Sequence, residues 1–157
     1  MLNNIDFKQI VRNAPLLAID LVVLDDQNQI LLRQRINATA KVYWFVPSGR
    51  AFKNESLEKA FFRISKAELG LPSERSLAVL LGIYDHFYSD SVFDENTNTH
   101  FINAAYLIKM KMGQALNLPR AQHHDFRWLS LNDIKRDNTV HQFSKIFLDE
   151  LITVIPN

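Results

Sequence analysis

Cysteine is absent from the 157 residues of this chain. Disulfide bonds, thiolate zinc sites and a cysteine nucleophile are therefore excluded, and the composition is in keeping with a reducing compartment. A broad basic surface is missing as well, because 18 Lys and Arg residues nearly balance 17 Asp and Glu residues. The resulting net charge of +1 argues against nucleic acid as a partner, although local Arg clusters can still bind phosphate.

Long apolar runs and targeting signals are also missing. No apolar stretch reaches the roughly 20 residues that span a bilayer, so no membrane association is expected. The N-terminus, Met1–Asp6, lacks a charged segment followed by an apolar run, and we expect no secretory signal. With no internal repeat and 47% hydrophobic residues, the sequence predicts one soluble, cytoplasmic domain spanning residues 1–157.

The chain does contain an alternation of β-rich and helical patterns. Strands are predicted at 16–24, 30–35, 43–46, 77–88, 100–110 and 127–129, and helices at 6–13, 56–69 and 140–155. Pro47-Ser48-Gly49 is predicted to form a turn, and the polar stretch 89–99 a loop between two paired strands. Strands interleaved with substantial helices predict an α/β or α+β layered domain.

The helix predicted at 56–69 carries a carboxylate on its apolar side. Its core-facing stripe consists of Leu57, Ala60, Phe61 and Ile64. Glu68 lies four residues after Ile64 and therefore falls within this stripe. An unpaired buried carboxylate costs several kcal/mol. Glu68 must then reach water in the last turn, bind a metal ion, or pair with an Arg such as Arg63, and periodicity alone does not choose among these.

The spacing around this helix forms a known motif. Gly49, Glu55, Arg63, Glu68 and Gly70 give the pattern Gly-x5-Glu-x7-Arg-x4-Glu-x-Gly. The pattern resembles the signature of the Nudix hydrolases, a loop–helix–loop that holds a divalent cation against a diphosphate. Most members have acids at the positions of Ile64 and Ala67, so the resemblance implies fewer charged ligands than usual.

A narrower resemblance covers most of the chain. The matching segments, in order, are Leu31-Leu32 with Arg35, Tyr43–Pro47, Arg63–Leu71, His86–Tyr88, Gln122–Leu129, and Asn138 with His141. They are similar to segments of the GDP-mannose mannosyl hydrolases, a Nudix branch. This resemblance implies an α/β/α sandwich with a mixed central β-sheet. It also implies hydrolysis of a GDP-sugar, GDP-mannose or GDP-glucose, to GDP and free hexose by water attack at the anomeric carbon with inversion.

The resemblance assigns a metal site. One Mg²⁺ per active site, with Mn²⁺ as an alternative ion, is expected on the side chains of Glu68 and Gln122 and the backbone carbonyl of Ser48. The family usually has Gly at the position of Ser48. A carbonyl ligand does not depend on the side chain, provided that the backbone does not need a positive φ.

The resemblance also assigns the remaining polar residues. His123 matches the general base, and an imidazole has a suitable pKa for this role near neutrality. Three residues match groups that contact the diphosphate or the nucleotide sugar, Arg35, Arg50 and Arg63, and an Arg fork suits two phosphate oxygens. Three more match the substrate site, with Asp20 at the sugar end: Asp20, His86 and Tyr88.

One expected donor is missing. The family has a Tyr whose hydroxyl assists the departing diphosphate, and Phe101 occupies that position. Removing one such donor costs about 2–4 kcal/mol of transition-state stabilisation unless another group, such as His100 or Tyr106, replaces it.

Two other functions remain open at this stage. One is conventional Nudix P–O cleavage of a nucleoside diphosphate derivative, against which the missing acids argue. The other is a non-catalytic module that binds a nucleotide sugar. The resemblance further implies a homodimer.

Overall fold

The structure is a computed structural model that describes residues 2–35, 43–89, 96–119 and 124–155, with the backbone alone for Arg35 and His124. Its helices are α1 (Asn4–Asn13), α2 (Leu57–Leu69), α3 (Leu131–Arg136) and α4 (Leu148–Val154), with the 3₁₀ turns η1 (Arg75–Leu77) and η2 (Gln142–Ser144). Its strands are β1 (Leu16–Leu24), β2 (Gln29–Arg35), β3 (Trp44–Phe45), β4 (Ser48–Arg50), β5 (Val79–Tyr88), β6 (Thr99–Lys109) and β7 (His124–Ser130).

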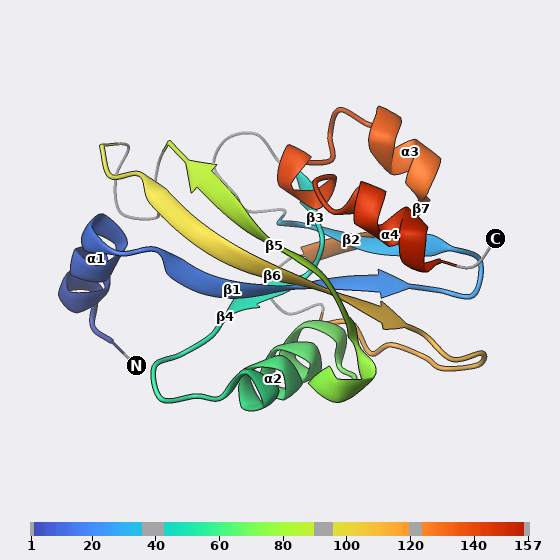
Figure 1. The fold of residues 1–157 in the computed structure, drawn as a ribbon, viewed down its shortest axis with the longest axis horizontal. Coiled ribbons are helices and arrows are strands. Elements are labelled where there is room, and N and C mark those ends of the chain that lie inside the picture. The colour runs from blue at the N-terminus through green and yellow to red at the C-terminus, as the bar shows by residue number, and fades with distance from the viewer. Residues whose placement is uncertain (1, 36–42, 90–95, 120–123, 156–157) are drawn as a thin grey trace.

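All seven strands belong to one mixed sheet (Figure 1). The main order is β3-β2-β1-β6-β5, with β4 added to β1 and β7 added to β2. Strands β1 and β6 run parallel, and the other pairs are antiparallel. The predicted α/β fold with a mixed central sheet is therefore confirmed. In the described segments, no helix combines the length and hydropathy that a bilayer span requires.

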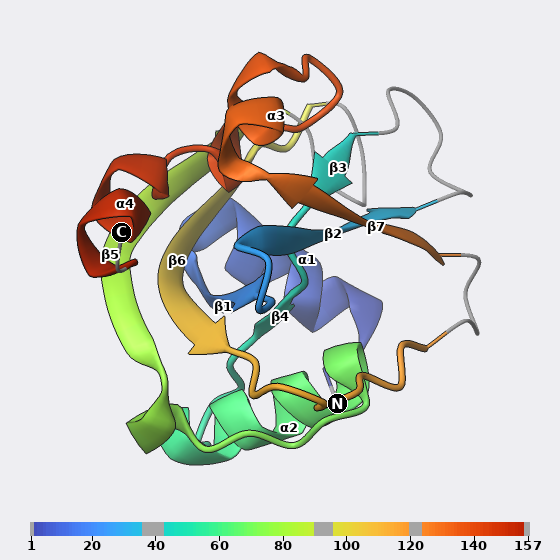
Figure 2. The ribbon, with the colours of Figure 1, turned by 90° about the vertical axis from the view of Figure 1, so that its right-hand side faces the viewer.

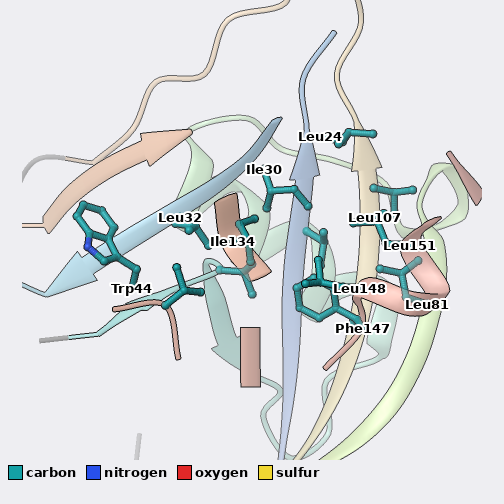
Figure 3. Close-up of a cluster of buried hydrophobic side chains, with 14 residues drawn as sticks. Leu24, Ile30, Leu32, Trp44, Leu81, Leu107, Ile134, Phe147, Leu148 and Leu151 are labelled. Carbon is teal, nitrogen blue, oxygen red and sulfur yellow. The ribbon is translucent and has the colours of Figure 1, made fainter. Parts of the chain in front are cut away.

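Helices cover both faces of this sheet, as the view turned by 90° shows (Figure 2). On one face, Phe61 and Ile64 of α2 pack on alternate residues of β1, such as Ile19 and Leu21. On the other face, Ile134 of α3, Leu151 of α4 and Phe147, which immediately precedes α4, are buried against the strands (Figure 3). Because side chains alternate along a strand, β1 contributes to both cores and is buried almost throughout.

The helix α2 matches its sequence prediction closely. The Ser56 side chain accepts a hydrogen bond from the backbone N–H of Lys59 and caps the helix start. Gly70 ends the helix in the left-handed region at φ 62°, and a Cβ there would lie 2.0 Å from the carbonyl oxygen of Asn117. Leu57, which we expected in the core stripe, is instead 36% exposed and lies outside the cluster that contains Ala60, Phe61 and Ile64.

The predicted C-terminal helix 140–155 is wrong. Val140 forms a parallel β-bridge to Trp44, and the backbone N–H of His141 donates to the Trp44 carbonyl. The chain then turns through η2, and only α4 is helical. Apolar residues at helical spacing therefore serve a bridge, a turn and a short helix in succession.

Three other elements differ from expectation. The turn predicted at residues 47–49 overlaps β4, whose three residues pair with β1. Helix α3 was not anticipated, although Ser130 caps it by accepting from the backbone N–H of Asp133. The expected strand 77–88 begins later, because Leu77 belongs to η1.

Candidate active site

The loop between β4 and α2 is braced by the ion pair of Glu55 and Arg63. The Nε and Nη2 atoms of Arg63 donate to the two carboxylate oxygens of Glu55 at 2.6 and 2.9 Å. Nη2 also donates to the carbonyl oxygen of Arg50 at 2.7 Å, and Glu55 accepts from the backbone N–H of Phe52. Hydrogen bonding to Arg63 lowers the pKa of Glu55. The Glu and the Arg of the motif thus fix the loop that joins the helix to β4.

Arg50 and Arg63 place two cations near each other. Burial and the charge of Arg63 both lower the pKa of Arg50. The Arg50 guanidinium lies over the ring of Phe7 in α1, 4.1 Å from its centroid, so the N-terminal helix helps to hold it. Glu55 already compensates Arg63, whereas Arg50 is repelled by its neighbour and is stabilised by an added anion. This end of the site is suited to a polyphosphate.

Ser48 has a backbone that can offer its carbonyl. Among the described residues with positive φ, Asn28 and Asn54 are the ones that are not glycine, so Ser48 does not need the conformation that glycine favours. In the β1–β4 ladder, Leu21 N–H donates to Pro47 and Ala51 N–H donates to Leu17, so the Ser48–Asp20 pair between them is the non-hydrogen-bonded type. The Ser48 carbonyl therefore points away from β1.

Glu68 is paired with an arginine, but not with the one expected from sequence. Nη1 of Arg33, on β2, donates to Oε2 of Glu68. Both side chains are largely buried, with 18% and 22% of their surface exposed. The partner that we considered, Arg63, is engaged by Glu55 instead. Pairing with Arg33 compensates the carboxylate that interrupts the apolar stripe of α2.

The described part of the site is compatible with a divalent cation. A carboxylate has lone pairs for several partners, so Glu68 can accept from Arg33 and still bind an ion. Its oxygens and the Ser48 carbonyl are the hard ligands that Mg²⁺ prefers. Within the described residues, no group of three or more His, Cys, Asp and Glu side chains gathers to hold a metal.

Asp20 alternates with Val22 and Leu24 of β1 and therefore lies on the α3–α4 face of the sheet, opposite the face that α2 covers. It is 4% exposed and accepts a hydrogen bond at Oδ1 from Nδ2 of Asn103, at 2.8 Å. Burial raises the pKa of Asp20 to about 7, and the bond from Asn103 opposes this rise. Asp20 is thus poised between its neutral and charged forms near neutral pH.

His86 lies two strands away on the same face, within a group of stacked rings. It is 4% exposed, and its ring stacks on Phe143 of η2 at 4.3 Å and 7°. Burial lowers the pKa of His86 to about 4, so the imidazole is neutral at pH 7. Tyr88 meets Phe143 edge-on at 5.1 Å, and His141 stacks on Phe45 at 4.7 Å. An aromatic wall therefore borders the end of the sheet that holds His86 and Tyr88.

Phe101 belongs to the same wall and meets Tyr88 edge-on at 6.2 Å. His100 points to the other face, where it pairs with Asp85 at 2.9 Å and stacks on Phe87. Tyr106 also belongs to the α2 face, and its hydroxyl bonds to Arg75. His100 and Tyr106 therefore lie on the other face from Phe101, and neither can replace a hydroxyl group at position 101. The Tyr88 ring, in contrast, contacts Phe101 directly.

Three predicted site residues fall outside this description. Gln122 and His123 lie outside the described residues, and so does the side chain of Arg35. Of the others, the structure brings Ser48, Arg50 and Arg63 together around β4. It places Asp20, His86 and Tyr88 on the α3–α4 face.

Sequence reasoning missed two side chains that contact predicted site residues. Arg33 is an ionic residue inside a β-rich segment, but nothing in its spacing pointed 35 positions ahead to Glu68. Asn103 is an amide inside an apolar strand, the same signal that singled out Asp20. Both had the signature of a buried polar group, and only the tertiary fold identifies their partners.

Comparisons with known proteins agree with this geometry. The profile of the NUDIX domain matches residues 14–151. The low-salt glycan biosynthesis protein Agl8 of Haloferax volcanii is 34% identical over 105 residues, which make up 67% of this chain and 65% of Agl8. The chain therefore matches slightly less than two thirds of the length of that relative.

Solved structures show the same fold. A MutT NUDIX hydrolase from Burkholderia pseudomallei superposes with a TM-score of 0.70 at 24% identity, covering 88% of this chain and 99% of that one. The NUDIX domain of NrtR from Shewanella oneidensis, crystallised with ADP-ribose, gives 0.65 at 19% identity, with 97% and 98% covered. The shared sheet, the loop–helix–loop of β4 and α2, and a domain match over most of the sequence together show that the chain belongs to the Nudix hydrolase family.

Proposed function

We propose that this chain is a Mg²⁺-dependent hydrolase of a GDP-sugar, GDP-mannose or GDP-glucose, that breaks the C–O bond at the anomeric carbon. The observation that carries the proposal is the environment of Ile64, where most Nudix enzymes have an acid. Ile64 is 1% exposed, and its side chain fills the space beside Gly49, where a Cβ would lie 2.9 Å away. Ile64 therefore packs an apolar side chain, and not a carboxylate, against β4. The low number of carboxylates is thus built into the core and favours a single weakly charged metal site.

The distribution of charge supports a substrate with an ionic and a neutral end. Arg50 and Arg63 provide cations at β4, whereas the α3–α4 face offers Asp20, the neutral His86 and aromatic rings. A diphosphate is attracted to the first group and repelled by a carboxylate in the second. A nucleotide sugar fits this separation because its hexose is uncharged.

The proposed reaction is a displacement at carbon. Water attacks the anomeric carbon and gives a proton to His123, while the bond from carbon to the diphosphate oxygen breaks and GDP leaves with the electron pair. The Arg50 and Arg63 guanidinium groups stabilise the charge that grows on the leaving diphosphate. Glu68, Gln122 and the Ser48 carbonyl would hold Mg²⁺, or Mn²⁺ as the alternative ion, and the ion would supply further positive charge there. Arg35 is assigned to the nucleotide end of the substrate.

The relative Agl8 is named for glycan biosynthesis, and a nucleotide sugar as substrate is in keeping with that name. A cytoplasmic location remains a prediction from the sequence.

We also propose that two copies of the chain associate through β5. This strand lies at the edge of the sheet as described, with β6 as its neighbour. Three apolar residues of β5 pair with Tyr106, Ala104 and His100 of β6 and share a face of the sheet with them. Of these, Leu80 is 48% exposed, and Ile83 and Phe87 are each 65% exposed. Exposed apolar residues on a long edge strand favour pairing with another chain. A second copy that covers this face accounts for them.

Hydrolysis in ¹⁸O-labelled water tests the catalytic proposal. With GDP-mannose or GDP-glucose and Mg²⁺, we expect the label on the hexose and none on GDP. Label on a phosphate product would instead establish conventional P–O cleavage of a nucleoside diphosphate derivative. Binding of the GDP-sugar without turnover would show a recognition module, and either of these results overturns the proposal.

A further inference from the structure

Asn103 is an unusual residue for its place in the fold. It lies in β6 on the face where the following alternate residues, Ala105 and Leu107, belong to the apolar core. Only 5% of Asn103 is exposed. A buried amide destabilises a fold unless its donors and acceptor find partners. A purely structural position here would be occupied more favourably by an apolar residue.

The Asn103 amide uses only part of its hydrogen-bonding capacity within the described protein. Its Nδ2 donates to Asp20, but its Oδ1 is buried and has no partner among the described residues. The same is true of Nε2 of His86. In the β5–β6 register, Asn103 is opposite Tyr84, and His86 is opposite Phe101, so the two unpaired atoms belong to diagonal neighbours on one face.

Such atoms in a native protein point to a missing partner. The partner of Asn103 Oδ1 must be a hydrogen-bond donor, because a carbonyl oxygen only accepts. The Asp20 carboxyl beside it repels phosphate oxygens but also accepts from hydroxyl groups. The rings of Phe143 and Tyr88 border this area and provide apolar contact. Hydroxyl groups attached to a ring with apolar C–H faces are the chemistry of a sugar.

The position of Asp20 indicates which of the two sugar rings of a GDP-sugar, the ribose or the hexose, lies beside Asn103. Asp20 and Ser48 are direct cross-strand neighbours, and Ser48 adjoins the Gly49–Arg50 segment at the cationic end. In the proposed complex, a substrate group beside Asp20 therefore lies next to the diphosphate held at this cationic end. In a GDP-sugar this is the hexose or the ribose, and the hexose is the part that must lie beside the proposed reaction centre.

We propose that Asn103 is a specificity-determining residue, whose Oδ1 accepts a hydrogen bond from a hydroxyl group of the hexose while its Nδ2 holds Asp20 in place. This inference rests on the proposed GDP-sugar substrate. It extends that proposal by naming a side chain that selects the sugar. An acceptor that is fixed by a second buried group recognises the position of one hydroxyl, because any ligand that lacks this hydroxyl leaves the Asn103 oxygen unpaired.

Calorimetric binding of GDP-mannose, GDP-glucose and GDP to the full chain tests the inference. In Asn103→Leu we expect the Kd of the better-bound GDP-sugar to rise about 10-fold, the effect of one buried neutral hydrogen bond. The Kd of GDP, which lacks the hexose, should stay within about 2-fold. Ile102→Val, on the same strand but the opposite face, should change neither value.

A second measurement avoids substitution in the core. The wild-type chain is compared with GDP-hexoses that lack one hydroxyl at a time. One of these analogues should bind about 10-fold more weakly to wild type, and Asn103→Leu should not distinguish it from the parent sugar. The inference is overturned if Asn103→Leu raises the Kd values of GDP and GDP-sugar equally. It is also overturned if the wild type binds every analogue that lacks a hydroxyl as tightly as the parent sugar.

These results separate the two proposals. A hexose-specific loss without any hydrolysis by the wild type would support the role of Asn103 and overturn the enzymatic proposal. Hydrolysis at carbon with no hexose-specific loss would do the reverse. Failure of the wild type to bind either GDP-sugar overturns both.

Discussion

Arg33 on β2 donates a hydrogen bond to the carboxylate of Glu68 near the end of α2, across 35 positions of sequence. This pair joins the sheet to the residue that the Nudix motif assigns to the metal. It also means that a cation already faces the carboxylate that is proposed to bind another cation. The Arg33 charge and a divalent ion therefore compete electrostatically for Glu68.

Replacing Arg33 is expected to strengthen metal binding. In Arg33→Gln, the Mg²⁺ concentration for half-maximal hydrolysis should fall several-fold, because the competing charge is removed while a hydrogen-bond donor remains. Arg33→Lys keeps the charge and should stay near the wild-type value. A higher Mg²⁺ requirement in Arg33→Gln would show that Arg33 chiefly orients the carboxylate.

Glu68 itself should be essential. Glu68→Gln retains a side-chain oxygen but loses the negative charge, and we expect the hydrolysis rate to fall at least about 100-fold at saturating substrate. Glu58→Gln is the matched control, since Glu58 lies on the same helix and pairs with Arg75 at the surface. An exposed pair of this kind contributes little. Near wild-type rates in Glu68→Gln would remove Glu68 from the metal site.

Asp20 should make stability depend on pH. Its pKa is raised from 3.8 to about 7 in the folded chain, so between these values the folded state keeps a proton that the unfolded state has lost. The contribution of Asp20 to stability is therefore present below pH 4 and is lost as pH rises through 7. For three pKa units this amounts to at most about 4 kcal/mol.

Asp20→Asn tests this dependence. The Asn side chain does not titrate, so its free energy of unfolding relative to wild type should improve steadily from pH 4 to pH 8. Urea denaturation of both proteins at several pH values measures the difference, in which other groups, including His86, largely cancel. A difference that does not change with pH would contradict the raised pKa.

Part of this structure follows from sequence and part does not. Local signals located β1, α2 with its Ser56 and Gly70 ends, and the anomaly of Glu68 on an apolar stripe. The tertiary partners were not predictable, because Asn103 and Asp20 are 83 positions apart and either side chain alone has several possible roles. The spacing from Val140 onward indicated a helix that does not form, since the bridge of Val140 to Trp44 depends on a strand far earlier in the chain.

Tyr88 is expected to compensate for Phe101. Its ring contacts Phe101 in the aromatic wall, so we take its hydroxyl as the candidate group to assist the departing diphosphate. Tyr88→Phe should therefore lower kcat by about 10-fold or more. In the double variant Tyr88→Phe with Phe101→Tyr, the new hydroxyl should restore much of the loss. An unchanged kcat in Tyr88→Phe would contradict this role and assign the Tyr88 ring to packing alone.

The apolar side of β5 makes self-association testable by a single charge. Ile83 is 65% exposed in the single chain, so the monomer should tolerate a lysine at this position. In the proposed dimer the same lysine would be buried. Light scattering after size-exclusion chromatography should show a dimer for wild type and a monomer for Ile83→Lys. Met112→Lys makes the same change at a residue that is 89% exposed and lies beyond the end of β6, and it should leave the dimer intact. If Ile83→Lys remains dimeric, β5 is not the contact surface, because an unpaired buried ammonium group would weaken such an interface by several kcal/mol.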